Sequence, residues 1–116
     1  DKKLFSKAKK SLLIINTARG PIINLDDLYA ALKENMISGA ALDVLPQEPP
    51  TSLHPLLKAY VNEDQWLSGK FTLTPHVAFY SPPGLEDLRS KSVRTAISYI
   101  NNQSLRNCQN IEYLKA

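Results

Sequence analysis

Apolar runs alternate with amphipathic segments along most of this chain. Three short apolar runs predict buried strands, and they lie at residues 12–15, 40–44 and 71–74. Apolar positions at helical spacing predict helices over 24–35, within 53–60 and over 85–100, and residues 1–10 are interpreted as the end of a further amphipathic helix. Strands that alternate with helices in this way are typical of right-handed βαβ units. The pattern therefore predicts an α/β fold with about three parallel strands and flanking helices.

Local signals refine these elements. Asn24 is the expected N-cap of the helix over 24–35. The first segment places Leu4, Phe5 and Ala8 on one side, with lysines around them as a solvated face. Residues 82–84 (PPG) predict a turn before the last helix. We interpret residues 59–70 as a surface insertion, in which Trp66 is either a structural residue or an anchor for a partner.

Length and charge exclude several classes of protein. The chain has 116 residues, which suffice for one domain, and a net charge of +3 that is too evenly mixed to predict nucleic-acid binding. It has one cysteine, Cys108, so no disulfide forms within the chain. No apolar run reaches the length of a membrane span. We expect a cytoplasmic protein, with a nuclear location as the alternative, that binds neither a metal nor a membrane.

The glycines exclude one common nucleotide-binding device. The four glycines are Gly20, Gly39, Gly69 and Gly84, and no two are close in sequence. A glycine-rich loop that binds phosphate needs several glycines within a few residues. The chain therefore carries no phosphate-binding loop of its own.

Charged side chains follow each predicted strand. They are Arg19, then Asp43 and Glu48, then His76. Because the carboxyl ends of parallel strands share one edge of a sheet, we expect these groups to gather there as an acid–base site. Each group alone has a plainer interpretation: a surface ion pair for the arginine, a packed turn residue for the histidine, and a solvated loop carboxylate for Glu48.

Three motifs in order resemble the back half of the D-isomer-specific 2-hydroxyacid dehydrogenases. They are residues 15–20 (INTARG), residues 39–44 (GAALDV) leading to Glu48-Pro49, and residues 74–78 (TPHVA). The resemblance covers roughly residues 1–100. It implies the second half of a Rossmann-like, doubly wound parallel sheet, in which 1–100 is the C-terminal part of a dinucleotide-binding domain. Residues 101–116 would then be a tail that returns to the substrate domain.

Within that family, the chain is most similar to the branch of the C-terminal-binding-protein corepressors. Residues 76–81 (HVAFYS) resemble a histidine, alanine, alanine, tryptophan, tyrosine, serine run of that branch, with Phe79 in place of the tryptophan. Residues 104–108 (SLRNC) resemble its tail. This similarity keeps open an alternative function, a non-catalytic, corepressor-like interaction module.

The family resemblance implies a role for each candidate residue. Arg19 would bind the substrate carboxylate, His76 would exchange a proton with the substrate oxygen, and Glu48 would pair with the imidazole and raise its pKa. Asp43 would lie near the nicotinamide ribose or carboxamide. The residues implied beside the cofactor are Thr17, Ala18, Arg19, Asp43, His76 and Ala78.

The resemblance also implies partners. The cofactor would be NAD or NADP, and the substrate a small 2-oxo or 2-hydroxy acid such as glyoxylate or hydroxypyruvate. The family's glycine-rich turn and substrate domain have no counterpart in this sequence, so we expect a fragment that is inactive alone. It would need the missing N-terminal half of the enzyme or a homodimer partner, and its first strand would present an unpaired edge and an apolar face. A plain α/β domain with structural Arg, Glu and His is a third interpretation.

Overall fold

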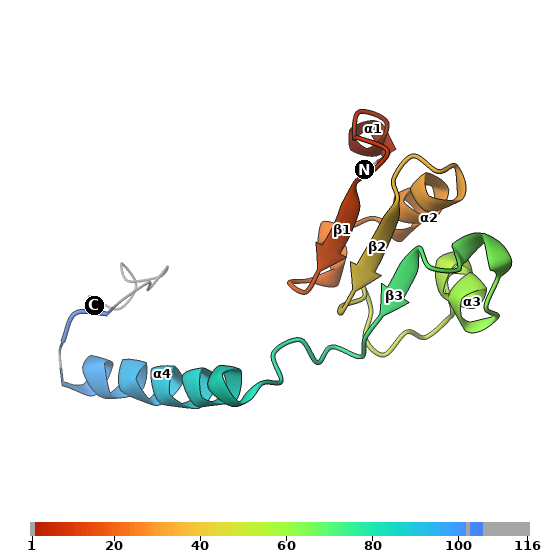
Figure 1. Cartoon of the computed structure of the whole chain (residues 1–116). Helices are drawn as coiled ribbons and strands as arrows, with labels where there is room; N and C mark the ends of the chain where they lie inside the picture. The colour runs from red at the N-terminus through yellow and green to blue at the C-terminus, as the bar shows by residue number, and fades with distance from the viewer. Residues whose placement is uncertain (1, 102, 106–116) are drawn as a thin grey trace. The chain divides into compact units, whose positions relative to one another are not determined.

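The computed structural model describes residues 2–101 and 103–105 (Figure 1). Their contacts divide the chain into two compact units, Asp1–Ala78 and Phe79–Ala116. The first unit contains the sheet and all the residues that we predicted to form the site. Each unit is described by itself below.

A three-stranded parallel sheet forms the centre of the first unit. Its strands are β1 (Leu13–Asn16), β2 (Gly39–Leu42) and β3 (Phe71–Leu73), in the order β1-β2-β3. Ile15 lies opposite Ala41, which lies opposite Thr72. The predicted three parallel strands and α/β class are therefore confirmed. Since both strand pairs are parallel, the three carboxyl ends lie side by side at one edge of the sheet.

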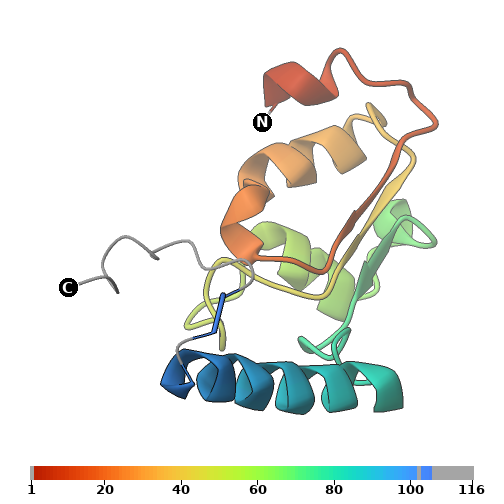
Figure 2. The same ribbon diagram turned by 90° about the vertical axis from the view of Figure 1, so that its left-hand side faces the viewer.

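Two helices cover one face of this sheet (Figure 2). Helix α2 (Leu25–Lys33) begins after Asn24, whose side chain accepts a hydrogen bond from the Asp27 amide at 3.0 Å, as a predicted N-cap should. Helix α3 (Pro55–Val61) is capped by His54, whose Nδ1 accepts from the Leu56 amide. Their inward side chains form a common core with the sheet, including Leu28, Leu32, Leu56, Leu57, Leu42 and Phe71.

The N-terminal helix is shorter than predicted. Helix α1 spans only Lys2–Phe5 and packs Phe5 into the core, with Ala8 partly buried against it. Leu4 is 67% exposed, so our placement of Leu4 on the buried side was wrong. Leu4 lies about 100° around the helix axis from Phe5, and in this single turn only the Phe5 side faces the core.

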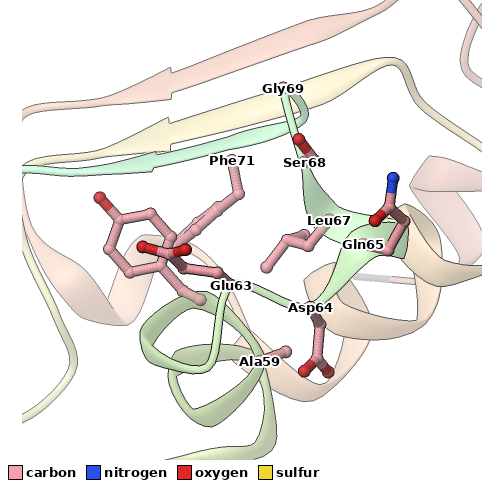
Figure 3. A pocket seen from close by; sticks show the side chains of 9 residues that line it. Ala59, Glu63, Asp64, Gln65, Leu67, Ser68, Gly69 and Phe71 are labelled. Atoms are coloured by element: carbon pink, nitrogen blue, oxygen red, sulfur yellow. The ribbon is translucent and has the colours of Figure 1, made fainter.

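The segment before β3 lies at the surface and packs part of its length into the core. Its 3-10 helix η2 (Gln65–Leu67) buries Leu67, and the half-buried Trp66 ring meets Tyr29 of α2 edge-on, at 5.5 Å between ring centroids. The indole Nε1 donates to Asp64 at 3.2 Å. Most of residues 60–69 are exposed, while Leu67 and Trp66 pack against the core beside α2. A shallow hollow beside it is lined by residues 59–71 and includes Glu63 and Phe71 (Figure 3).

The opposite face of the sheet exposes apolar side chains. Leu13 and Ile15 of β1 are 67% and 74% exposed. Within residues 2–101 and 103–105, β1 pairs with β2 alone. This matches the apolar face and unpaired edge that we expected on the first strand.

The second unit consists mainly of helix α4 (Pro82–Ile100). The helix begins where we predicted a turn, because Ser81 caps it by accepting from the Gly84 amide at 3.1 Å, and prolines are tolerated in a first helical turn. No helix in the described part of the chain is long and apolar enough to cross a membrane. Cys108 and most of the predicted tail at 101–116 lie outside the described residues.

Candidate functional site

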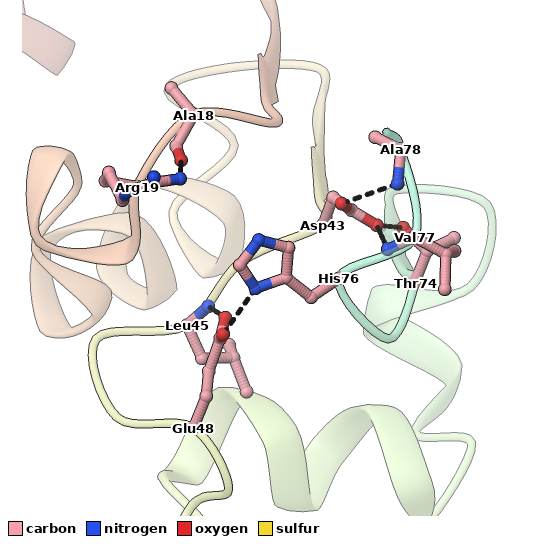
Figure 4. Close-up of polar contacts among 9 residues, drawn as sticks. All are labelled: Ala18, Arg19, Asp43, Leu45, Glu48, Thr74, His76, Val77 and Ala78. Atoms are coloured by element: carbon pink, nitrogen blue, oxygen red, sulfur yellow. Dashed lines mark hydrogen bonds and ion pairs between the residues drawn. The ribbon is translucent and has the colours of Figure 1, made fainter. Parts of the chain in front are cut away.

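The carboxyl ends of the three strands are aligned by backbone hydrogen bonds. The Asp43 amide donates to the Asn16 carbonyl at 2.9 Å, and the Thr74 amide donates to the Leu42 carbonyl at 2.9 Å. The loops that leave the strands therefore start from one level of the sheet. The candidate residues Arg19, Glu48 and His76 lie on these loops (Figure 4).

Glu48 and His76 form the central contact of the site. The Glu48 Oε2 atom lies 2.6 Å from Nδ1 of His76, and its Oε1 atom accepts from the Leu45 amide at 2.6 Å (Figure 4). Both carboxylate oxygens are thus held, one by the loop after β2 and one by the imidazole. The pair is partly open to solvent, with side chains 44% exposed for His76 and 35% for Glu48. A half-open carboxylate–imidazole pair can relay a proton to a bound molecule.

Asp43 holds the backbone that carries His76. The buried Asp43 carboxylate accepts from the Val77 and Ala78 amides, each at 2.9 Å, and from the Thr74 hydroxyl (Figure 4). His76 itself has a φ of 53°, a left-handed conformation that costs free energy in a non-glycine residue. Three donors on one carboxylate stabilise this conformation, so Asp43 fixes the direction in which the imidazole leaves the chain.

The loop after β1 is shaped by a buried asparagine. The Asn16 side chain accepts from the Ala18 amide at 3.1 Å and donates to the Arg19 carbonyl at 3.0 Å. This closes a tight turn that leaves Thr17, Ala18 and Arg19 exposed. The Arg19 guanidinium donates to the Ala18 carbonyl at 2.7 Å. The structure thus joins Glu48 directly to His76, while the Arg19 side chain bonds within its own loop.

The other residues that we predicted beside the cofactor lie either next to Asp43 or on the turn with Arg19. Ala78 reaches the site through its amide on Asp43, whereas Thr17 and Ala18 lie on the exposed turn with Arg19. Among the residues that the structure describes, no group of three or more His, Cys, Asp or Glu side chains could hold a metal ion.

A pocket of about 450 Å³ lies beside the Glu48–His76 pair. This volume is within the range of small-molecule sites. Its walls are mainly apolar, while Asp43, Glu48 and His76 supply the ionisable groups. The apolar side chains that line it come from Leu45, Pro49, Pro50, Leu73 and Pro75.

Both carboxylates of the site are held in their charged form. The Leu45 amide, followed by the hydrogen bond with His76, lowers the pKa of Glu48 below its usual value. The Thr74 hydroxyl, followed by the Ala78 and Val77 amides, lowers the pKa of Asp43 although burial opposes it. Near neutral pH both groups are therefore anionic acceptors.

The lowered pKa of Asp43 predicts a loss of stability in acid. A depressed folded-state pKa contributes stability above the ordinary aspartate pKa of about 3.9, and this contribution disappears as the pH falls through the folded-state pKa. We expect the urea midpoint of unfolding to fall between pH 7 and pH 3, and to fall less in an Asp43→Asn variant. Asp27→Asn, at a half-buried position in the first turn of α2, is the control. If the urea midpoint of Asp43→Asn fell with pH as much as that of the parent chain, Asp43 would not stabilise the loop that carries His76.

The sequence analysis did not predict three groups that shape the site. They are the Thr74 hydroxyl on Asp43, the Leu45 amide on Glu48, and Asn16 within its turn. Asn16 had a usable signal, since an asparagine at the end of a strand often bonds to the backbone two residues later. The bond to Leu45 had none, because nothing in the sequence indicates which amide a loop carboxylate reaches.

Comparison with known proteins agrees with the geometry. Residues 1–78 match the family profile described as "D-isomer specific 2-hydroxyacid dehydrogenase, NAD binding domain". The glyoxylate reductase of Thermofilum pendens is 36% identical over 109 residues, which are 94% of this chain and 30% of that enzyme.

Solved structures of reductases and dehydrogenases are also similar to this chain. An acyclic imino acid reductase in complex with NADPH and D-arginine is 30% identical, with a TM-score of 0.68, over 88% of this chain and 29% of that one. A D-lactate dehydrogenase from Aquifex aeolicus, complexed with NAD and lactic acid, is 27% identical, with a TM-score of 0.62, over 88% and 32%. The chain thus spans about a third of the length of these relatives.

Proposed function

Because this chain belongs to the D-isomer-specific 2-hydroxyacid dehydrogenase family and matches its NAD-binding domain over residues 1–78, we propose that it forms the proton-transfer and carboxylate-binding half of a 2-oxoacid reductase site. The reaction would reduce a small 2-oxo acid, such as glyoxylate or hydroxypyruvate, to its 2-hydroxy acid. One observation carries the proposal: the 2.6 Å Glu48–His76 pair lies at the sheet edge that also carries Arg19.

The residues present fit one end of a dinucleotide. The pocket at the strand ends combines apolar walls with few ionisable groups, which suits a flat ring such as nicotinamide. The chain lacks a glycine-rich loop, so the pyrophosphate would be held elsewhere in the complete enzyme. When bound, the reduced cofactor supplies the hydride that adds to the 2-oxo carbon. We propose Thr17, Ala18 and Ala78 as neighbours of this cofactor.

Arg19 would hold the substrate by its carboxylate. The guanidinium presents two parallel N–H groups that match the two oxygens of a carboxylate, and it stays charged at any physiological pH. Its exposed position on the turn after β1 leaves it accessible to a small acid. Binding would replace the hydrogen bond of 2.7 Å that the guanidinium gives to the Ala18 carbonyl.

His76 would deliver the proton. Glu48 holds Nδ1, so the proton given to the 2-oxo oxygen is the one on Nε2, the ring nitrogen that points away from Glu48 (Figure 4). As hydride reaches the carbon, the oxygen gains negative charge and takes this proton, which yields the hydroxyl group. The anionic Glu48 holds the ring through Nδ1 during the transfer. In the oxidative direction, His76 takes the proton back.

A chimera tests the proposal. This chain replaces the segment that it matches in the Thermofilum pendens glyoxylate reductase, so that the rest of that enzyme supplies a glycine-rich loop and a substrate domain. We expect the chimera to oxidise NADH or NADPH with glyoxylate or hydroxypyruvate, and not with acetaldehyde, which lacks the carboxylate. The 116-residue chain alone is the control and should be inactive. A folded chimera that binds cofactor but reduces no 2-oxo acid would refute the proposal.

The alternative of a corepressor-like interaction module receives no support from the relatives described above, which are reductases and dehydrogenases.

The boundary between the cofactor-binding part and the tail is also part of the proposal. The family match ends at residue 78, where the first compact unit also ends, and we propose that residues 101–116 return to the substrate domain of the complete enzyme.

A further inference from the structure

The loop after β1 approaches the loop after β2 closely at Gly20. Gly20 is buried at the start of the 3-10 helix η1 (Gly20–Ile22), directly after Arg19. A Cβ atom built on Gly20 would lie 2.0 Å from both the carbonyl carbon and the carbonyl oxygen of Leu45, and 2.3 Å from the Pro46 nitrogen. All three are backbone atoms, so no side-chain rotation could relieve the collision. Position 20 therefore admits only glycine at the present spacing of the two loops.

The backbone that Gly20 touches is the one that orients Glu48. The Leu45 amide donates to Glu48 Oε1 at 2.6 Å, and the other oxygen of the same carboxylate holds His76. Arg19 lies one residue away on the other side of the contact. A single approach between two backbones thus sets the spacing between the loop that carries the guanidinium and the loop that holds the carboxylate–imidazole pair.

We propose that Gly20 is a positioning residue, which sets the separation between Arg19 and the Glu48–His76 pair through its contact with the Leu45–Pro46 backbone. The inference rests on the proposed function, because this separation must match the length of a 2-oxo acid between its carboxylate and its 2-oxo oxygen. Gly20 touches no reacting atom. Its effect passes through Leu45 to Glu48, and through Glu48 to His76.

The test compares two glycine variants of the 116-residue chain. Gly20→Ala must push the Leu45–Pro46 backbone away. We expect the Leu45 amide proton to lose its hydrogen-bonded NMR shift and to exchange about tenfold faster. Gly39→Ala is the matched control, because its Cβ would lie 2.8 Å from the Lys70 carbonyl oxygen, at the start of β2 and away from the Glu48 loop. It should disturb folding but leave the Leu45 amide unchanged.

The hydrogen bond of 2.9 Å between His54 and Asp26 reports folding independently. Should Gly20→Ala fail to fold, Pro46→Gly loosens the same backbone at an exposed position without a collision and should speed exchange of the Leu45 amide in the same direction. An unchanged Leu45 amide in a folded Gly20→Ala or Pro46→Gly variant would overturn the inference.

Measurements of chimera activity distinguish a failure of this inference from a failure of the proposed function. In the chimera, Gly20→Ala should lower kcat/KM for glyoxylate by about a hundredfold, as a displacement of about 1 Å does between substrate-holding groups. Gly39→Ala should not do so at temperatures where it is folded. If the parent chimera is inactive while the Leu45 amide still responds to Gly20→Ala, the proposed function fails and the positioning contact stands. If the chimera is active and Gly20→Ala retains full activity, the positioning role fails alone.

Discussion

Replacing His76 with asparagine is expected to lower turnover of the chimera by about 10²- to 10⁴-fold, the usual contribution of a positioned general acid. Asparagine tolerates the left-handed backbone that His76 adopts, with its φ of 53°, so the loop should keep its shape. The loss then reports the missing proton donor and not a displaced segment. Steady-state rates of NADH oxidation with saturating glyoxylate measure the effect.

The chain offers a matched control in its second histidine. His54 also contacts a carboxylate, through Nε2 and Asp26 at 2.9 Å, but it lies at the start of α3. His54→Asn should preserve the helix cap, because asparagine is a favourable N-cap residue, and should leave turnover unchanged. Comparable turnover in His76→Asn and His54→Asn would remove His76 from the proton-transfer step.

Replacing Arg19 with lysine is expected to lower kcat/KM for a 2-oxo acid by about tenfold to a hundredfold. Lysine keeps the positive charge but loses the planar fork, so one of two charge-assisted hydrogen bonds to the carboxylate disappears. The larger part of the effect should be in KM, because the lost contact is made with the bound substrate as well as the transition state. Rates measured over a range of glyoxylate concentrations separate the two constants.

Arg89 supplies the control for this substitution. It is an exposed arginine on α4, in the second unit, and Arg89→Lys should leave both constants unchanged. If Arg19→Lys leaves the KM for glyoxylate unchanged, another group holds the substrate carboxylate.

Much of the fold could be predicted from hydrophobic pattern. The runs at 12–15, 40–44 and 71–74 overlap the three observed strands and differ from them by one or two residues at most of their ends, since strands of a parallel sheet are usually apolar along their length. The start of α4 was misjudged, because prolines at 82 and 83 indicate a turn unless Ser81 is seen to cap the helix. The packing of Trp66 on Tyr29 could not be predicted either, because it depends on where η2 meets α2 in space.

The residues of the site could be predicted from the sequence, but most of the hydrogen bonds between them could not. The rule that ligands meet the carboxyl edge of a parallel sheet was enough to select Arg19, Asp43, Glu48 and His76. It could not indicate that Asp43 would bond to the amides after His76, nor that Glu48 would reach back to Leu45. Such contacts depend on loop conformation at the scale of an ångström, which the spacing of residues along a chain does not determine.

Because the strands lie in the sheet in the order in which they occur along the chain, the site can assemble from one side of the sheet to the other during synthesis. Arg19 emerges from the ribosome first, then Asp43 and Glu48, and His76 only about thirty residues after them. Until β3 docks on β2, neither carboxylate has its donors from residues 74–78. A nascent chain that has emerged only as far as about residue 70 can pair its first two strands, yet Asp43 and Glu48 then lack every donor that residues 74–78 supply.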